Sequence, residues 1–225
     1  MNPAKHISII MDGNGRWALQ KGKSRNYGHQ QGLRTIEKIV NYAIKKKILY
    51  LTLFTFSSEN WKRPKNEVNF LFNLLKNYFK KNLFKVIDNG IKVKIIGNKL
   101  GLAKNLRKII KLAEYKTRKN NKISVQLALN YGSKDEIINS FKIINRKKQK
   151  ITSKNFERNL YTSGFPNPDI LIRTGGQKRL SNFLLWQLAY TEIFFVSKMW
   201  PDFNQNDFNK IINKFKKIKR NFGTI

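Results

Sequence analysis

Residues 6–15 read HISIIMDGNG. The first six are mostly β-branched or apolar, and this composition predicts a short strand over residues 6–11. The Asp12-Gly13-Asn14-Gly15 segment that follows contains two glycines, which end the strand and favour a tight turn. A strand that ends in a glycine-rich turn is typical of α/β proteins, which bind ligands beyond the carboxyl ends of their strands.

Strand and helix patterns alternate along the rest of the chain. Runs of β-branched and aromatic side chains predict strands over residues 49–56, 91–96, 123–129, 169–172 and 192–196. Apolar side chains spaced by three and four residues predict helices over residues 32–46, 64–88, 103–117, 133–145 and 205–217, with a short helix before Pro166. This alternation predicts an α/β fold with a mostly parallel six-stranded sheet flanked by helices. No break in composition divides the chain, so we expect one domain over residues 1–225.

The composition excludes several functional classes. The 225 residues include no cysteine and only two histidines, which excludes a disulfide scaffold, a cysteine metal site and a cysteine nucleophile. No apolar run is long enough to cross a bilayer, and the N-terminal apolar run is too short for a signal peptide. We therefore expect a cytoplasmic protein.

The chain is strongly basic. It has 46 Lys and Arg residues against 13 Asp and Glu residues, a net charge of +33. Such an excess is typical of proteins that bind nucleic acid or an anionic membrane surface. Lysine, asparagine and isoleucine share AT-rich codons, however, and a biased genome is the simpler explanation. Because the basic residues are spread along the chain and do not cluster with aromatic residues, we expect no nucleic-acid partner.

Glycines, arginines and small hydroxyl side chains gather where the predicted strands end. The segments concerned are DGNGRW (12–17), SSENWKR (57–63), NYG (130–132) and RTGGQKR (173–179). Glycine lets backbone N–H groups approach an anion, and arginine offers two parallel donors to a phosphate. The carboxyl edge of the sheet is therefore predicted to bind a phosphate-bearing ligand.

The Gly13-x-Gly15-x-x-Ala18 spacing also matches the fingerprint of dinucleotide-binding proteins. That interpretation needs an acidic residue at the end of the second strand, where this chain has Thr55 and Ser57. Asp12 would also repel a bare pyrophosphate, whereas with Mg²⁺ between them the same carboxylate becomes a ligand. A diphosphate site that uses Mg²⁺ is therefore the better interpretation of this turn.

Several of these residues also have a purely structural explanation. Asp12 could form the turn at the strand end, and His29 could be a polar residue near a helix start. Glu67 could complement a helix dipole, while Ser57 and Asn60 could stabilise a turn. The two arginines of the 173–179 loop are harder to explain in this way, and they indicate a bound anion.

Six longer motifs together identify a family. They are HISIIMDGNGRWA (6–18), GH (28–29), FSSENWKRP (56–64), ALNYG (128–132), DILIRTGGQKRLSNFLLWQLAYTEIFF (169–195) and WPDF (200–203). In order and composition, from about residue 6 to residue 223, the chain resembles the cis-prenyltransferases of the bacterial undecaprenyl diphosphate synthase type.

The resemblance implies an enzyme that uses Mg²⁺ to condense isopentenyl diphosphate units onto farnesyl diphosphate. The family product is undecaprenyl diphosphate, the lipid carrier for cell-wall polysaccharide, and a different chain length is the alternative. The resemblance also implies a homodimer and a hydrophobic tunnel for the growing chain. Because the product is a lipid, we expect transient contact with the inner leaflet of the membrane.

The matching motifs suggest roles for individual residues. Asp12 matches the aspartate that holds Mg²⁺ and diphosphate, and Glu192 matches a carboxylate associated with Mg²⁺ at the second diphosphate. Asn60 and Ser57 match the condensation site, where the lost proton could pass either to the departing diphosphate or through these two residues. The residues that match substrate-binding segments are Gly13, Asn14, Gly15, Arg16, Trp17, Arg25, His29, Ser57, Ser58, Glu59, Trp61, Arg63, Glu67, Arg173, Arg179 and Ser181.

Three positions depart from the family pattern. Gln177 stands where glutamate is usual, Ser133 replaces the second glycine of NYGG, and Thr55 takes a place near the tunnel that alanine often holds. A neutral amide at position 177 adds no charge to a Mg²⁺ site, and Thr55 leaves the product length open. The expected activity class does not change, because Asp12 and the arginines of the strand ends remain.

Overall fold

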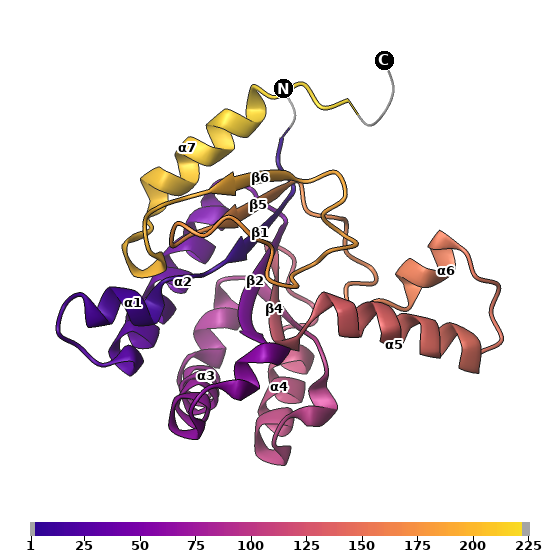
Figure 1. Ribbon diagram of the computed structural model, residues 1–225, viewed down its shortest axis with the longest axis horizontal. Coiled ribbons are helices and arrows are strands. Elements are labelled where there is room, and N and C mark those ends of the chain that lie inside the picture. The colour runs from indigo at the N-terminus through magenta and orange to yellow at the C-terminus, as the bar shows by residue number, and fades with distance from the viewer. Residues whose placement is uncertain (1–2, 222–225) are drawn as a thin grey trace.

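The computed structural model describes residues 3–221 and contains a six-stranded sheet in which every pair of neighbouring strands is parallel (Figure 1). The strand order is β3-β4-β2-β1-β5-β6, so β1 lies between β2 and β5. The predicted α/β architecture is confirmed, and each predicted strand is present. The strands are β1 (His6–Ile10), β2 (Tyr50–Ser57), β3 (Ile91–Ile96), β4 (Ile123–Tyr131), β5 (Ile170–Arg173) and β6 (Glu192–Phe195).

Seven α-helices and three short 3₁₀ helices connect the strands in the part of the chain that the structure describes. None of these helices is long and apolar enough to cross a membrane. The α-helices are α1 (Asn14–Leu19), α2 (Arg25–Lys45), α3 (Lys65–Asp88), α4 (Lys104–Lys116), α5 (Ser133–Arg146), α6 (Ser153–Arg158) and α7 (Gln205–Lys216), and the 3₁₀ helices are η1 (Ser58–Lys62), η2 (Lys99–Gly101) and η3 (Trp200–Asp202).

The helix α2 begins at Arg25, well before the predicted start at residue 32. The Ser24 side chain caps it by accepting a hydrogen bond from the Tyr27 N–H. Its first turns lack apolar spacing because they pack closely against α1: a Cβ on Gly28 would lie 2.0 Å from the Asn14 carbonyl oxygen. This close approach holds the turn after β1 against α2.

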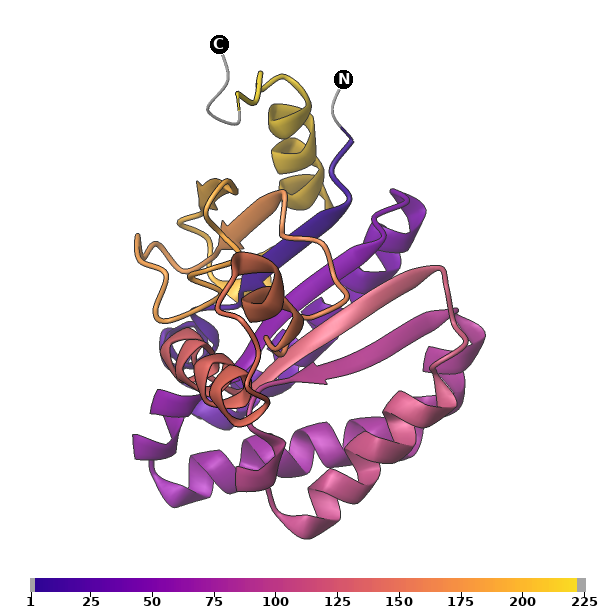
Figure 2. The same cartoon turned by 90° about the vertical axis from the view of Figure 1, so that its right-hand side faces the viewer.

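The two faces of the sheet are covered differently (Figure 1 and Figure 2). The main hydrophobic core lies between one face and the helices α2, α3, α4 and α7. A second cluster on the other face packs under the segment 180–188, while α5 and α6 form a small cluster of their own. In β1, Ile7 and Ile9 enter the main core and Ile10 enters the second cluster, as the two-residue repeat of a strand requires.

Near its end, β2 departs from regular pairing with β4. The register shifts between Phe54 and Phe56, so Thr55 bulges out of the ladder. The Thr55 hydroxyl donates a hydrogen bond of 2.6 Å to the Ala128 carbonyl of β4. The bulge turns Thr55 toward the space between the sheet, α2 and α3, where three cavities meet.

Candidate active site

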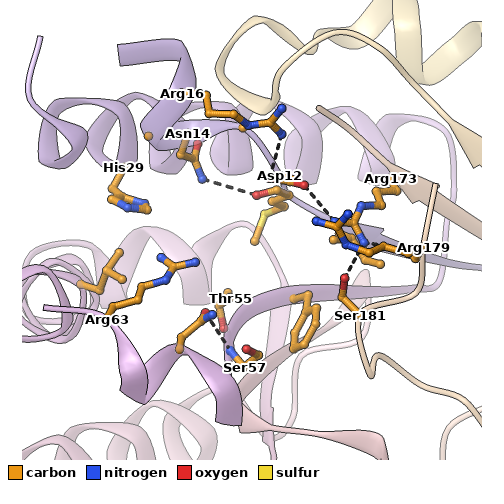
Figure 3. A pocket seen from close by; sticks show the side chains of 17 residues that line it. Asp12, Asn14, Arg16, His29, Thr55, Ser57, Arg63, Arg173, Arg179 and Ser181 are labelled. Carbon is orange, nitrogen blue, oxygen red and sulfur yellow. Dashed lines mark hydrogen bonds and ion pairs between the residues drawn. The ribbon is translucent and has the colours of Figure 1, made fainter. Parts of the chain in front are cut away.

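A cavity of about 330 Å³ lies at the carboxyl edge of the sheet, beside the ends of β1, β2 and β5 (Figure 3). Its charged and titratable side chains are four arginines, one histidine and one carboxylate, so its field favours an anion. Most of the residues predicted from the sequence line it. They are Asp12, Gly13, Asn14, Gly15, Arg16, His29, Ser57, Asn60, Arg63, Arg173, Arg179 and Ser181.

Asp12 is the centre of the arginine network. It follows β1, and its carboxylate accepts from Arg16 of α1 at 3.2 Å and from Arg173 of β5 at 2.9 Å. One guanidinium holds each carboxylate oxygen, Oδ1 by Arg16 and Oδ2 by Arg173. Arg16 also donates to the Gly175 carbonyl at 2.9 Å. Gly175 has a φ of 82°, and a Cβ at this position would lie 2.8 Å from the Arg16 side chain, so both its backbone conformation and this close approach favour glycine.

Arg173 connects Asp12 to the loop that follows β5. Its side chain is only 4% exposed, and it donates to the Ser181 hydroxyl at 2.8 Å and to the Arg179 carbonyl. The buried Arg173 Nε has no hydrogen-bond partner among residues 3–221. The exposed Arg179 is held by the Gln177 amide oxygen at 2.7 Å, which gives Gln177 a positioning contact with Arg179.

A second charged cluster surrounds Glu67 at the start of α3. Its buried carboxylate accepts from Arg25 at 3.0 Å, from His29 at 3.2 Å and from Arg63 at 3.0 Å. Burial alone would raise the pKa of Glu67, but hydrogen bonds from Arg25 and His29 and the charges of Arg25 and Arg63 outweigh it and lower the pKa to about 2. Burial lowers the pKa of His29, and its contact with Glu67 offsets this only in part. Glu67 therefore fixes the direction of His29 and Arg63, which both line the cavity.

Ser57 and Asn60 form a capping box at the start of η1. The Ser57 N–H donates to the Asn60 amide oxygen at 3.2 Å, and the Ser57 side chain accepts from the Asn60 backbone. The structural explanation of this pair is therefore correct, and both side chains also line the cavity. In the same turn, Glu59 accepts from Asn182 at 2.7 Å, which joins η1 to the loop that carries Ser181.

The remaining predicted residues lie outside the cavity lining. Trp17 stacks on Tyr27 with ring centroids 6.1 Å apart, and Trp61 donates to Asn130 at 2.7 Å. Ser58 donates to the neighbouring Glu59 carboxylate at 3.3 Å. Glu67 contacts the lining residues His29 and Arg63, while Arg25 binds Glu67 and lies against Gly15 of the lining.

Glu192 is the predicted residue that the fold separates from the others. It begins β6 in register with Ile170, the first residue of β5, whereas Arg173 at the end of β5 reaches Asp12. Three residues of strand put about 10 Å between these two levels of the sheet. Within one chain, therefore, the structure does not bring Glu192 to Asp12, and the predicted metal role of Glu192 remains a prediction.

Two apolar cavities continue from the arginine-rich cavity. The middle one, about 90 Å³, shares Asn14, His29 and Leu71 with the outer cavity. The inner one, about 80 Å³, shares Leu33, Ile36 and Leu75 with the middle one, and Thr55 lines all three. The three cavities lie in a row and share lining residues, and the hydrophobic tunnel remains a prediction.

The apolar walls include residues that were not among the predicted substrate-binding positions. Met11 and Phe54 line the outer cavity from the ends of β1 and β2, and Leu71 lines it from α3. The apolar face of α3 was visible in the sequence, but its spacing is the same as that of an ordinary core helix. Only the position of this face beside Thr55 shows that it lines a ligand space.

The fold and the site thus define an α/β enzyme for a ligand that is anionic at one end and apolar at the other. Residues 10–223 match the family described as "Putative undecaprenyl diphosphate synthase" (Prenyltransf), and the chain belongs to this family of prenyltransferases. Like the family, it is an enzyme that transfers prenyl groups.

Curated relatives and solved structures agree with this assignment. The chain is 43% identical to the isoprenyl transferase of Oceanobacillus iheyensis, over 100% of this chain and 92% of the relative. It is 45% identical to the isoprenyl transferase of Rickettsia typhi, over 99% of each chain. It matches the crystal structure of "a probable undecaprenyl diphosphate synthase" from Campylobacter jejuni at 36% identity and a TM-score of 0.85, with both chains covered completely. It also matches lavandulyl diphosphate synthase from Lavandula x intermedia, solved with dimethylallyl diphosphate, at 31% identity and a TM-score of 0.93 over 98% of each chain.

Proposed function

We propose that this protein elongates farnesyl diphosphate with isopentenyl diphosphate units in the cis configuration and that its product is undecaprenyl diphosphate. The observation that carries the proposal is the junction at Thr55, where a cavity with four arginines adjoins two apolar cavities. Such a junction can hold a diphosphate and a hydrocarbon chain at the same time. The isoprenyl transferases similar to this chain support the same reaction class.

The residues at the carboxyl edge fit a Mg²⁺ ion that arrives with diphosphate. No group of three or more acidic or histidine side chains that could hold a metal occurs within residues 3–221. Mg²⁺ is usually bound in proteins by one or two carboxylates together with substrate phosphates, however, and Asp12 supplies one carboxylate beside an anion-binding cavity. Asp12 would hold the ion, which when bound neutralises negative charge on the leaving diphosphate.

We assign the two diphosphates to different elements of the arginine network. We assign the allylic diphosphate to the turn after β1, with Gly13, Asn14 and Arg16, because these residues lie closest in the chain to Asp12. The isopentenyl diphosphate is assigned to Arg173, Arg179 and Ser181, which the β5 loop holds together. As the allylic C–O bond breaks, Arg16 stabilises the charge that develops on the departing oxygens.

The apolar residues control the cation and the chain. Met11, Phe54 and Leu71 exclude water from the carbon that becomes cationic, since water would otherwise capture it. Ser57 and Asn60 carry no titratable base and are held by their capping box, so we assign them to substrate positioning. The proton lost from the isopentenyl unit passes to an oxygen of the departing diphosphate.

We further propose that the protein is a homodimer that joins through the β6 edge. β6 is the last strand of the sheet, and Ile193 and Phe195 on it are 40% and 41% exposed. An open strand edge with exposed apolar side chains favours pairing with another copy. Glu192 would then lie at this interface, so a metal-related role for it would involve the second subunit.

Transient contact with the inner leaflet is supported by one exposed site on α3. Phe84 is 82% exposed and lies next to the exposed Lys80, Lys81 and Lys85. An aromatic side chain among lysines fits an anionic lipid surface. In a flotation assay with anionic vesicles, Phe84→Asp should reduce binding and Leu100→Asp, at an equally exposed position on η2, should not. Equal flotation of both variants, or no flotation of the unmodified protein, would exclude this contact.

The first test of the function is a condensation assay with radiolabelled isopentenyl diphosphate, farnesyl diphosphate and Mg²⁺. We expect a ladder of products that ends near eleven isoprene units. Asp12→Ala should abolish it, and Asp88→Ala, which removes an exposed acid at the far end of α3, should leave it unchanged. A folded unmodified protein that forms no product would refute the proposed function.

A further inference from the structure

Asn130, the last residue but one of β4, has a backbone conformation that most side chains avoid. Its φ is 50°, which lies in the left-handed region that asparagine tolerates better than other residues with a side chain. The pairing of β4 with β2 passes from Leu129 directly to Tyr131, so Asn130 is the extra residue of a bulge. A bulge of this kind re-aims a side chain, and such strained positions cluster at functional sites.

The Asn130 amide is held by a partner on each side. Its oxygen accepts a hydrogen bond of 2.7 Å from the Trp61 indole, and its NH₂ group donates at 2.8 Å to the Asn98 carbonyl. Because an indole N–H only donates and a carbonyl only accepts, one orientation of the amide satisfies both partners. Gly101 of η2 lies close to this amide, since a Cβ on Gly101 would be 2.8 Å from the Asn130 Nδ2. The side chain is therefore fixed in position and direction.

Trp61 connects Asn130 to the middle apolar cavity. The indole packs on Phe56 and on Phe72, with ring centroids 5.2 Å apart in each pair. Phe56 of β2 and Phe72 of α3 both line the middle cavity, and so does Leu129, the neighbour of Asn130 in β4. Trp61 itself is not a lining residue, so it supports the two phenylalanine rings from behind.

The hydrogen bond to Asn130 determines where the Trp61 indole lies. Trp61 is 43% exposed and belongs to η1, a helix of only five residues, so burial alone holds it loosely. A partly exposed side chain can change rotamer unless a partner fixes its polar end. Without Asn130, the indole would be free to leave Phe56 and Phe72, and this wall of the middle cavity would lose its support.

The wall that Trp61 supports faces one of the two substrates. The middle cavity shares His29 and Leu71 with the arginine-rich cavity, so a hydrocarbon attached to a diphosphate there would enter the middle cavity first. Farnesyl diphosphate carries such a hydrocarbon. The diphosphate of the isopentenyl unit is assigned to Arg173 and Arg179, which line the arginine-rich cavity and not the middle one. A change in the wall should therefore affect the binding of farnesyl diphosphate more than that of isopentenyl diphosphate.

We propose that Asn130 is a positioning residue for the allylic substrate. By holding Trp61 against Phe56 and Phe72, it fixes the apolar wall that receives the hydrocarbon part of farnesyl diphosphate. The inference rests on the proposed chain-elongating function. Asn130 lies outside the lining of the three cavities, so it acts through Trp61 and not by contact with a substrate. A residue needed only for folding would lower stability and leave the KM values of both substrates unchanged.

The test is steady-state kinetics of the condensation, with the KM of each substrate measured separately and urea unfolding recorded for every variant. Asn130→Gly fits the left-handed backbone and removes both side-chain hydrogen bonds. We expect it to raise the KM for farnesyl diphosphate about tenfold, the effect of losing one well-formed hydrogen bond, and to leave the KM for isopentenyl diphosphate unchanged. Asn130→Asp keeps an acceptor for the Trp61 indole, so it should recover most of this loss.

Two further variants show whether the effect passes through the indole. Trp61→Phe keeps an aromatic ring and removes the N–H donor. Combined with Asn130→Gly, it should be no worse than the stronger single variant, because both changes remove the same hydrogen bond. Asn98→Ala is the matched control, since it removes only the side-chain cap of the Leu100 N–H and keeps the backbone contacts of Asn98 with Asn130. It should not raise the KM for farnesyl diphosphate.

The outcomes separate this inference from the function on which it rests. If the unmodified protein forms no product, the proposed function fails and the inference fails with it. If product forms and Asn130→Gly keeps its KM for farnesyl diphosphate, or raises both KM values equally, only the role of Asn130 is refuted. Additive effects in the double variant, no recovery in Asn130→Asp, or an equal rise in Asn98→Ala would also refute it. If Asn130→Gly does not fold, Trp61→Phe decides alone, and an unchanged KM for farnesyl diphosphate refutes the proposal.

Discussion

Replacing Glu67 by glutamine should destabilise the protein and disturb the arginine-rich cavity together. The Glu67 side chain is 9% exposed and accepts hydrogen bonds from Arg25, His29 and Arg63. Glutamine keeps the shape but removes the charge that these three groups share. It can accept some of the hydrogen bonds, yet its NH₂ group would face donors.

The magnitude follows from the pKa of Glu67. A fall from the ordinary value of 4.5 to about 2 corresponds to roughly 3 kcal/mol of stability at neutral pH. Because the pKa is lower in the folded state, this stability is present above about pH 4.5 and is lost as the pH falls toward 2. About 2 kcal/mol of it should be lost by pH 3. Since glutamine retains part of the hydrogen bonding, we expect Glu67→Gln to cost roughly 1.5–3 kcal/mol at pH 7.

The assay is urea unfolding of both proteins at pH 7 and pH 3. The unmodified protein should lose more free energy of unfolding than Glu67→Gln between these two pH values, and the two proteins should converge at low pH. Asp88→Asn, at an exposed position on the same helix, should behave like the unmodified protein. If Glu67→Gln matched the unmodified protein at pH 7, or showed the same loss on acidification, the assignment of this stability to the Glu67 cluster would be wrong.

Three further predictions concern other parts of the molecule. Arginines hold both carboxylate oxygens of Asp12, so Mn²⁺ should bind weakly to the free protein and tightly once inorganic pyrophosphate is added. Electron paramagnetic resonance measures this binding, and equal binding in both states would contradict the prediction. Burial lowers the pKa of His6 from 6.5 to about 4, so roughly 3 kcal/mol of stability should be lost as the pH falls from 6.5 to 4. In urea unfolding, His6→Gln should reduce this dependence of the free energy of unfolding on pH. Glu136→Ala should cost roughly 2–4 kcal/mol in the same assay, because it removes the acceptor of the buried Tyr131 hydroxyl and of the Tyr161 N–H; a loss below about 0.5 kcal/mol would contradict it.

Local sequence patterns were sufficient for the strands and for most of the arginine-rich cavity. Strand patterns depend on neighbouring residues and on alternation, so β1 and β5 could be predicted directly. In a parallel sheet all carboxyl ends share one edge, which is why Asp12, Arg16 and Arg173 could be placed together before any contact was known. The start of α2 was missed because Gly28 and Gly32 interrupt its apolar spacing in order to admit Asn14.

The rule that predicted the site also shows why Glu192 does not join it. Glu192 was placed at the beginning of the sixth strand, and the beginning of a parallel strand lies at the edge opposite the site. Family motifs suggested a metal role for this residue without reference to its position along the strand. The metal role of Glu192 therefore remains a prediction.

The sequence by itself determined the class of fold, the anionic character of the ligand and the family. These features depend on short segments, in which the residue types alone predict the local structure and the kind of ligand. Only the tertiary structure decided that three basic residues converge on Glu67 and that Thr55 bulges toward three cavities. Such contacts join residues from separate elements, and they depend on strand register and helix packing, which no local pattern specifies.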